Sequence, residues 1–144
     1  MANIIDATLV VRGPHLDIET FATSKYRPHH ESEDRDEPWP CRAPVRVESV
    51  SPTVIRYDWD YKYPDPDGWV ADAAMAFPRL RWMLILIEQM SGLLWMCEIQ
   101  GDELVREEVG DKRRMRPRSR MAWNAYLEYF SEMHAKWLTE AGVV

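Results

Sequence analysis

Residues 55–104 constrain the fold of this chain more than any other stretch. They begin with a strand pattern whose alternate positions are large and apolar, which predicts one face against a core and one polar face. The apolar positions are Ile55, Tyr57, Trp59 and Tyr61, and the polar ones are Arg56, Asp58 and Asp60. A helix is predicted next, because Asp65 is a suitable N-cap, Pro66 suits the first helical position and Pro78 would stop the helix.

The other strands and helices are predicted from alternating apolar positions and from helical spacing, respectively. Strand patterns occur at residues 7–12, 45–50, 53–61, 82–87 and 93–99, and an edge strand is predicted at 104–109. A short helix is expected after Gly13-Pro14. The strongest helical periodicity lies after Pro117, with its apolar stripe at Trp123, Tyr126, Leu127, Phe130, Met133, His134, Trp137 and Leu138.

An antiparallel sheet of four or five strands, covered on one side by two helices, is the simplest way to bury these faces. This arrangement predicts an α+β fold of the ferredoxin-like type. We place that domain at residues 1–110, with a long exposed loop at 27–44, where four prolines and dense charge oppose a packed element. Residues 111–144 are expected to form a basic linker and an extra C-terminal helix, packed on the same domain, on a partner, or on a second copy in a homodimer.

Composition excludes several classes of protein. The net charge of −6 argues against a generic nucleic-acid binder, because phosphate neutralisation needs a basic surface. Cys41 and Cys97 lie far apart and match no metal spacing, which favours a reducing cytoplasm. The longest uninterrupted apolar run, 82–87, is far shorter than the ~18 residues of a membrane span. We therefore expect no membrane association and no cofactor, since no phosphate-binding glycine loop or zinc spacing occurs in the sequence.

Short motifs carry a resemblance to a known family. They are Met1-Ala2-Asn3, Gly13-Pro14, the aromatic strand ending in Trp59, Pro64-x-Pro66, Phe77-Pro78-x-Leu80, Gly92 and Gly101-Asp102-Glu103-Leu104-Val105. Over roughly residues 1–108 the chain resembles the YubB-like ferredoxin-like family of plasmid and phage proteins. It departs from that pattern at Ile4-Ile5, where Trp-Cys is common. The resemblance implies a fold and a mobile-element origin in a bacterial host; it implies no site residues, because the family's biochemical function is not established.

Three carboxylates are candidates for catalysis. Asp58 and Asp60 would share one strand face, and Glu98 on a neighbouring strand could supply a third ligand for Mg²⁺ in phosphoryl transfer. The alternative is that they are ordinary solvent-face residues of a half-covered sheet. Pro64-Asp65 with Glu98-Ile99-Gln100 fits a nuclease-like pattern, although N-capping explains Asp65 more simply.

Histidine and cysteine offer weaker candidates. His29 and His30 beside the acidic run could hold a metal, but a solvated loop explains them as well. His134 fits a core or interface histidine in the apolar stripe, and Cys97 is expected to face the core.

Two oppositely charged segments are candidates for partner binding. The acidic one contains Glu31, Glu33, Asp34, Asp36 and Glu37, and the basic one, residues 112–120, contains Arg113, Arg114, Arg116 and Arg118. Such segregated charge speeds encounter with a charged partner.

These observations favour a non-enzymatic phage or plasmid accessory protein that binds a host protein. The mobile-element resemblance suggests inhibition of a defence system, such as a CRISPR complex or a restriction enzyme. A metal-dependent nuclease or phosphotransferase using Asp58, Asp60 and Glu98 is one alternative. Nucleic-acid binding through residues 112–120 is the other.

Overall fold

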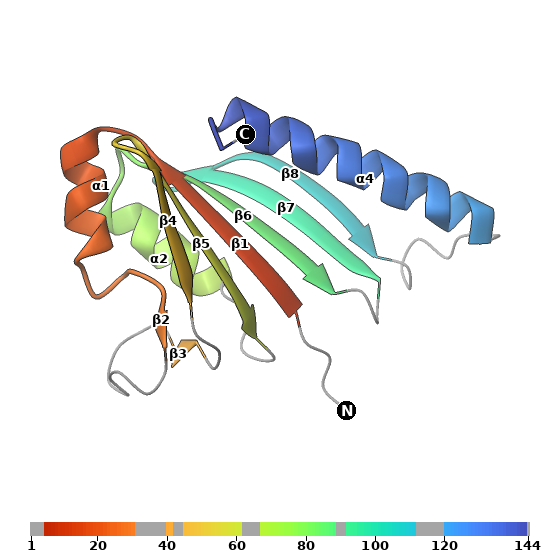
Figure 1. Ribbon diagram of the computed structural model, residues 1–144, viewed down its shortest axis with the longest axis horizontal. Helices are drawn as coiled ribbons and strands as arrows, with labels where there is room; N and C mark the ends of the chain where they lie inside the picture. The colour runs from red at the N-terminus through yellow and green to blue at the C-terminus, as the bar shows by residue number, and fades with distance from the viewer. Residues whose placement is uncertain are drawn as a thin grey trace.

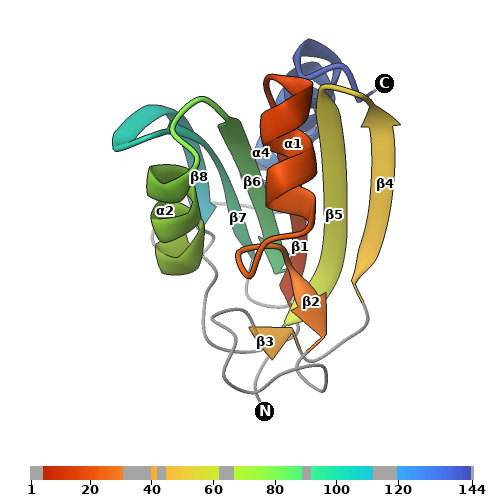
Figure 2. The ribbon, with the colours of Figure 1, turned by 90° about the vertical axis from the view of Figure 1, so that its left-hand side faces the viewer.

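A computed structural model describes residues 5–30, 40–41, 45–61, 67–88, 92–111 and 120–143. These residues form an α+β fold in which one six-stranded antiparallel sheet carries helices on both faces. Two helices cover one face and the C-terminal helix crosses the other (Figures 1 and 2). The elements of the main fold are β1 (Ile5–Arg12), α1 (His15–Ala22), β4 (Arg46–Ser51), β5 (Val54–Tyr61), α2 (Asp67–Ala76), β6 (Arg81–Glu88), β7 (Leu93–Gln100), β8 (Glu103–Asp111) and α4 (Arg120–Glu140).

The strands lie in the order β4-β5-β1-β6-β7-β8. The expected four or five strands are too few, because all six predicted strand patterns join one sheet, including the nine-residue β8 that pairs along the whole of β7. The prediction that it is an edge strand is confirmed. The strands predicted at 45–50 and 53–61 are β4 and β5, which form an antiparallel hairpin with a register shift between Ser49 and Ser51.

Residues 27–44 contain two strands that the sequence pattern did not predict. These are β2 (His29–His30) and β3 (Pro40–Cys41), which pair in parallel as a separate two-stranded sheet. Two-residue strands have no measurable periodicity, so pattern reasoning cannot find them. Residues 31–39 and 42–44 of the expected loop lie outside the described residues.

The first core lies between the sheet and the helices α1 and α2. Phe21 of α1 is fully buried and its ring meets those of Tyr57, Phe77 and Trp82 edge-on, with centroids 4.7–5.7 Å apart. Edge-to-face packing is the preferred geometry of aromatic pairs. The alternation predicted for β5 is confirmed, because Ile55, Tyr57 and Trp59 belong to this core. Cys97 is buried in it too.

The second core lies under α4, on the opposite face. Its helix contributes Trp123, Phe130, Trp137 and Leu138, all buried, against sheet residues that include Val10, Met83 and Met96. The apolar stripe of the C-terminal helix therefore packs on the sheet of the same chain. Within the described residues, no helix is both long enough and apolar enough to cross a membrane.

Candidate functional site

Glu98 is the one buried charged residue in the described part of the chain. It lies on β7, on the α4 face, and its side chain is 1% exposed. The two residues before it on this face of the strand, Leu94 and Met96, are apolar and buried. A buried carboxylate is costly unless it is paired and hydrogen-bonded, so its partners define the site.

Three arginines from three other strands surround Glu98. Arg12 of β1 donates from Nη2 to Glu98 Oε1 at 2.8 Å, and Arg106 of β8 donates from Nε to Oε2 at 2.7 Å. Nε of Arg81, on β6, also lies 2.8 Å from Oε1. That contact is an ion pair without hydrogen-bond geometry, because Nε of Arg81 has no hydrogen-bond partner in the part of the chain that the structure describes. Both carboxylate oxygens of Glu98 are thus occupied by guanidinium groups.

The same arginines attach the end of α4 to the sheet. Arg12 Nη1 donates to the backbone carbonyl of Glu140 at 2.8 Å, and Arg106 Nη1 donates to the Glu140 carboxylate at 2.8 Å. The guanidinium of Arg106 also stacks over the Trp137 ring, 3.9 Å from its centroid. Cations near a helix C-terminus are favourable, because the last carbonyls lack partners within the helix. This cluster of Glu98 with Arg12, Arg81 and Arg106 therefore has a structural role, because it docks α4 on the sheet.

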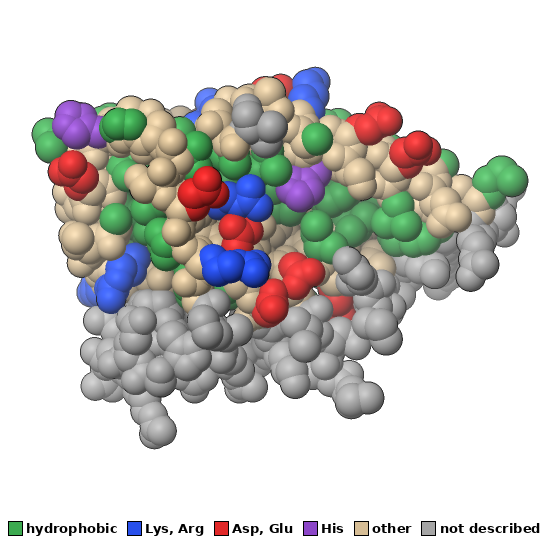
Figure 3. Space-filling model, viewed as in Figure 1, with side chains coloured by type: hydrophobic (Ala, Val, Ile, Leu, Met, Phe, Trp, Pro, Cys, Tyr) green, Lys and Arg blue, Asp and Glu red, His purple; other side chains and the backbone are tan. Residues whose placement is uncertain are grey.

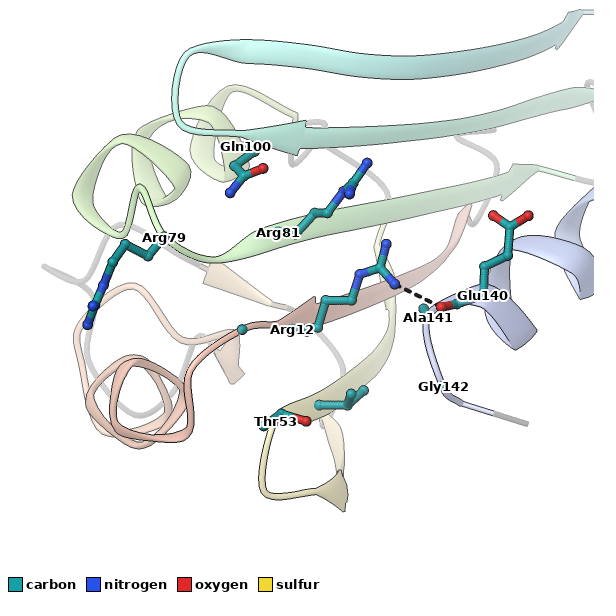
Figure 4. A pocket seen from close by; sticks show the side chains of 10 residues that line it. Arg12, Thr53, Arg79, Arg81, Gln100, Glu140, Ala141 and Gly142 are labelled. Carbon is teal, nitrogen blue, oxygen red and sulfur yellow. Dashed lines mark hydrogen bonds between the residues drawn. The ribbon is translucent and has the colours of Figure 1, made fainter.

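An open hollow of about 530 Å³ lies beside this cluster, and we call it the arginine hollow (Figure 4). It is formed where β1, β6 and β7 meet the C-terminal end of α4. The lining side chains with polar groups are those of Arg12, Thr53, Arg79, Arg81, Gln100 and Glu140.

Arg81 contributes its two terminal guanidinium nitrogens to the arginine hollow. Its side chain is 37% exposed, and its Nε lies 2.8 Å from Glu98 Oε1. Among the described residues, neither terminal nitrogen of Arg81 has a hydrogen-bond acceptor. Arg79 differs, because its Nε and Nη2 donate to the Asp17 carboxylate at 2.9 and 2.6 Å, and it points away from the other two arginines in Figure 4.

The register of the sheet explains the positive charge here. Arg12 and Arg81 are directly opposed on neighbouring strands, and Gln100 is opposed to Arg81 on the next strand. Like charges at opposed positions repel each other. The buried carboxylate of Glu98 offsets that repulsion, because it contacts both arginines. The guanidiniums of Arg12, Arg81 and Arg106 outnumber the carboxylates of Glu98 and Glu140 by one, in a chain whose net charge is −6. The arrangement can hold an anion through parallel N–H donors.

A second set of polar and charged side chains lies at the other end of the α4 face, over β1, β4 and β5 (Figure 3). Asp58 accepts hydrogen bonds from Thr8 at 2.7 Å and from Arg56 at 2.8 and 3.2 Å. Asp6 and Asp60 are opposed on β1 and β5. A hydrogen bond with Asp60 raises the pKa of Asp6 above its usual value; burial and the like charge of Asp60 act in the same direction, while Arg46 opposes them.

The structure places the three candidate catalytic carboxylates on the same face without bringing them together. The expectation that Glu98 lies on a strand neighbouring that of Asp58 and Asp60 is wrong, because β1 and β6 intervene. No three His, Cys, Asp or Glu side chains among the described residues group as metal ligands do. Asp58 and Glu98 instead contact cations of the protein itself.

Several predicted sites lie outside the described residues. They are the acidic segment with Glu31, Glu33, Asp34, Asp36 and Glu37, the basic segment with Arg113, Arg114, Arg116 and Arg118, and the predicted N-cap residue Asp65. His29 and His30 are described only as strand backbone. Partner binding through the two charged segments stays a prediction.

Sequence reasoning missed the arginines around Glu98, although a signal for them exists. Arg12, Arg81 and Glu98 all fall at alternate positions that share a face with buried apolar residues. Charged residues at such positions indicate a buried ion cluster, because an unpaired charge there would be too costly. The partners themselves could not be assigned without the strand order.

Comparison of the chain with models of known protein families, with curated proteins and with solved structures gives no match. The resemblance to the YubB-like ferredoxin-like family therefore stays a prediction from the motifs.

Proposed function

We propose that this protein is a non-enzymatic binding protein that holds an acidic group of a partner protein in the arginine hollow. The observation that carries the proposal is the pair of terminal nitrogens on Arg81, which have no acceptor among the described residues and face an open, positively charged surface. A guanidinium presents parallel N–H donors that match both oxygens of a carboxylate.

The chemistry of the lining favours binding over catalysis. Arginine stays protonated at all physiological pH values, and the Gln100 amide does not titrate. These arginine and amide groups can orient and neutralise an anion without exchanging a proton, and the Glu140 carboxylate in the lining is paired with Arg106. The carboxylate of Glu98 is held by arginines on both oxygens, which supports a role in orienting donors.

A protein partner suits the surface around the arginine hollow. Leu16 of α1 is 62% exposed next to Asp17, whose carboxylate holds Arg79 at the rim. Arginine donors beside exposed apolar side chains are typical of protein interfaces. An acidic side chain or a carboxyl terminus of the partner would occupy the hollow, with apolar contact at the rim.

The partner that we propose is a bacterial host protein, and its membership of a defence system rests on the motif resemblance. A ferredoxin-like topology is part of the same proposal. In its support, the elements β1, α1, β4, β5, α2 and β6 follow in β-α-β-β-α-β order. Their strands lie as β4-β5-β1-β6, and the β7–β8 hairpin extends the sheet.

Calorimetric titration with a blocked tetraglutamate peptide at low ionic strength tests the binding function, with tetraglutamine as the uncharged control probe. Arg81→Gln should weaken tetraglutamate binding tenfold or more, as expected for lost hydrogen bonds to a charged group. Arg79→Gln removes the same charge from the same rim, but its donors already serve Asp17, so it should have a much smaller effect. Equal losses in the two variants would show that binding depends on net charge only, and the proposed site would be wrong.

A further inference from the structure

A cavity of about 430 Å³ lies under α4, away from the arginine hollow, and we call it the helix cavity. It is formed by the ends of β6 and β7 and by one face of α4. Its apolar walls are Ile87, Leu94, Trp123, Leu127 and Phe130. Small-molecule sites are of this size, mostly apolar, with a few polar groups that fix orientation.

The polar groups of the helix cavity include the imidazole of His134. The Nε2 atom of His134 is buried and has no hydrogen-bond partner among the described residues. An unsatisfied buried nitrogen is unusual in a folded protein and calls for an occupant that hydrogen-bonds it. Ser131 and Glu88 also line the cavity and add polar groups near its edge.

The charges around His134 favour a neutral occupant. Burial lowers the pKa of His134, and Arg56 on β5 lowers it further, while Asp58 opposes this shift more weakly. A lowered pKa favours the uncharged imidazole. The Glu88 carboxylate in the cavity wall would repel an anion, and an apolar wall disfavours any ion.

We propose that the helix cavity is a binding site for a small neutral molecule with an aromatic or aliphatic body and one hydroxyl group that hydrogen-bonds His134. The body would lie among Trp123, Leu127 and Phe130. This site is independent of the proposed function, since the arginine hollow shares no lining residue with it.

The test compares p-cresol with p-xylene, which has the same shape but a methyl group in place of the hydroxyl. Binding is followed by NMR shifts of the Trp123 indole and the Leu94 methyl groups, with Trp82, in the other core, as an internal control. We expect p-cresol to bind roughly threefold to tenfold more tightly than p-xylene, as one hydrogen bond allows. His134→Phe should abolish this preference, and Lys136→Ala, on the exposed side of α4, should keep it.

Leu127→Trp provides a second variant, because the larger side chain would fill the cavity and should remove binding of both probes. Arg81→Gln should leave both affinities unchanged, which separates this site from the arginine hollow. An absence of shifts with either probe, or equal affinities in the native protein, would overturn the proposal. So would a p-cresol preference that survives His134→Phe.

Discussion

The two faces of the sheet are built differently, although the same alternating strands supply both. The face under α1 and α2 is apolar throughout its core, from Ile5 to Cys97. The face under α4 is apolar in its middle, at Val10, Met83 and Met96, and charged at both ends. Two helices cover the first face, whereas one helix crosses the second (Figures 1 and 2). A single helix cannot cover a six-stranded sheet, so the uncovered ends carry the groups available for binding.

We expect the largest effects from truncating one buried phenylalanine ring in each of the two cores. Phe21→Ala and Phe130→Ala each remove a buried ring, one from each face, and each should lower the free energy of unfolding by about 3–5 kcal/mol. Urea unfolding followed by circular dichroism measures both. A much smaller loss for Phe130→Ala would show that α4 contributes little to stability and that the second face is only loosely covered.

Glu98→Ala tests whether the charged end of the α4 face is part of the folded core. It leaves three guanidiniums clustered without their shared carboxylate and should cost about 3–5 kcal/mol. Glu103→Ala, at an exposed position on β8, is the matched control and should change stability by about 0.5 kcal/mol or less. Equal small effects for the two variants would mean that Glu98 is solvated in solution.

The first face could be predicted from the sequence and the second only in part. Alternation in β5 and helical spacing in α4 are local signals, and both led to the correct buried sides. The position of Glu98 depends on β1 and β6 lying between β5 and β7, which is a property of strand order. Local periodicity contains no information about strand order, so the arginine hollow could not be predicted.

Gly110→Ala probes the contact between α4 and β8. A Cβ at Gly110 would lie 2.7 Å from Cζ of Tyr126, which is too close for two carbon atoms. We expect a loss of about 1–3 kcal/mol from overpacking. A Cβ at Gly68, in α2 on the other face, would have no atom within 4 Å. Gly68→Ala should therefore raise the free energy of unfolding by about 0.5–1 kcal/mol, because alanine favours a helix more than glycine does. A neutral Gly110→Ala would show that Tyr126 moves freely and that α4 is not fixed over β8.

The smallest effect concerns the opposed pair Asp6 and Asp60. Because the pKa of Asp6 is raised in the folded protein, its contribution is stabilising at low pH and is lost as pH rises through that folded value. Asp6→Asn keeps a hydrogen bond without the charge. It should raise stability at pH 7 by about 0.5 kcal/mol, since solvent screens an exposed pair, and should have less effect near pH 3. Thermal melts at both pH values measure it, and a loss of stability at pH 7 would contradict the assignment.

We propose that the arginine end of the α4 face binds anions, whereas the opposite face does not. Titration with inorganic phosphate at low ionic strength, followed by NMR of arginine side-chain N–H groups and of the Gln100 amide, tests it most directly. We predict the largest shifts at Arg81, smaller ones at Arg12 and Gln100, and none at the Trp82 indole on the other face. Shifts that are largest at Arg79, or equal at all arginines, would contradict the claim.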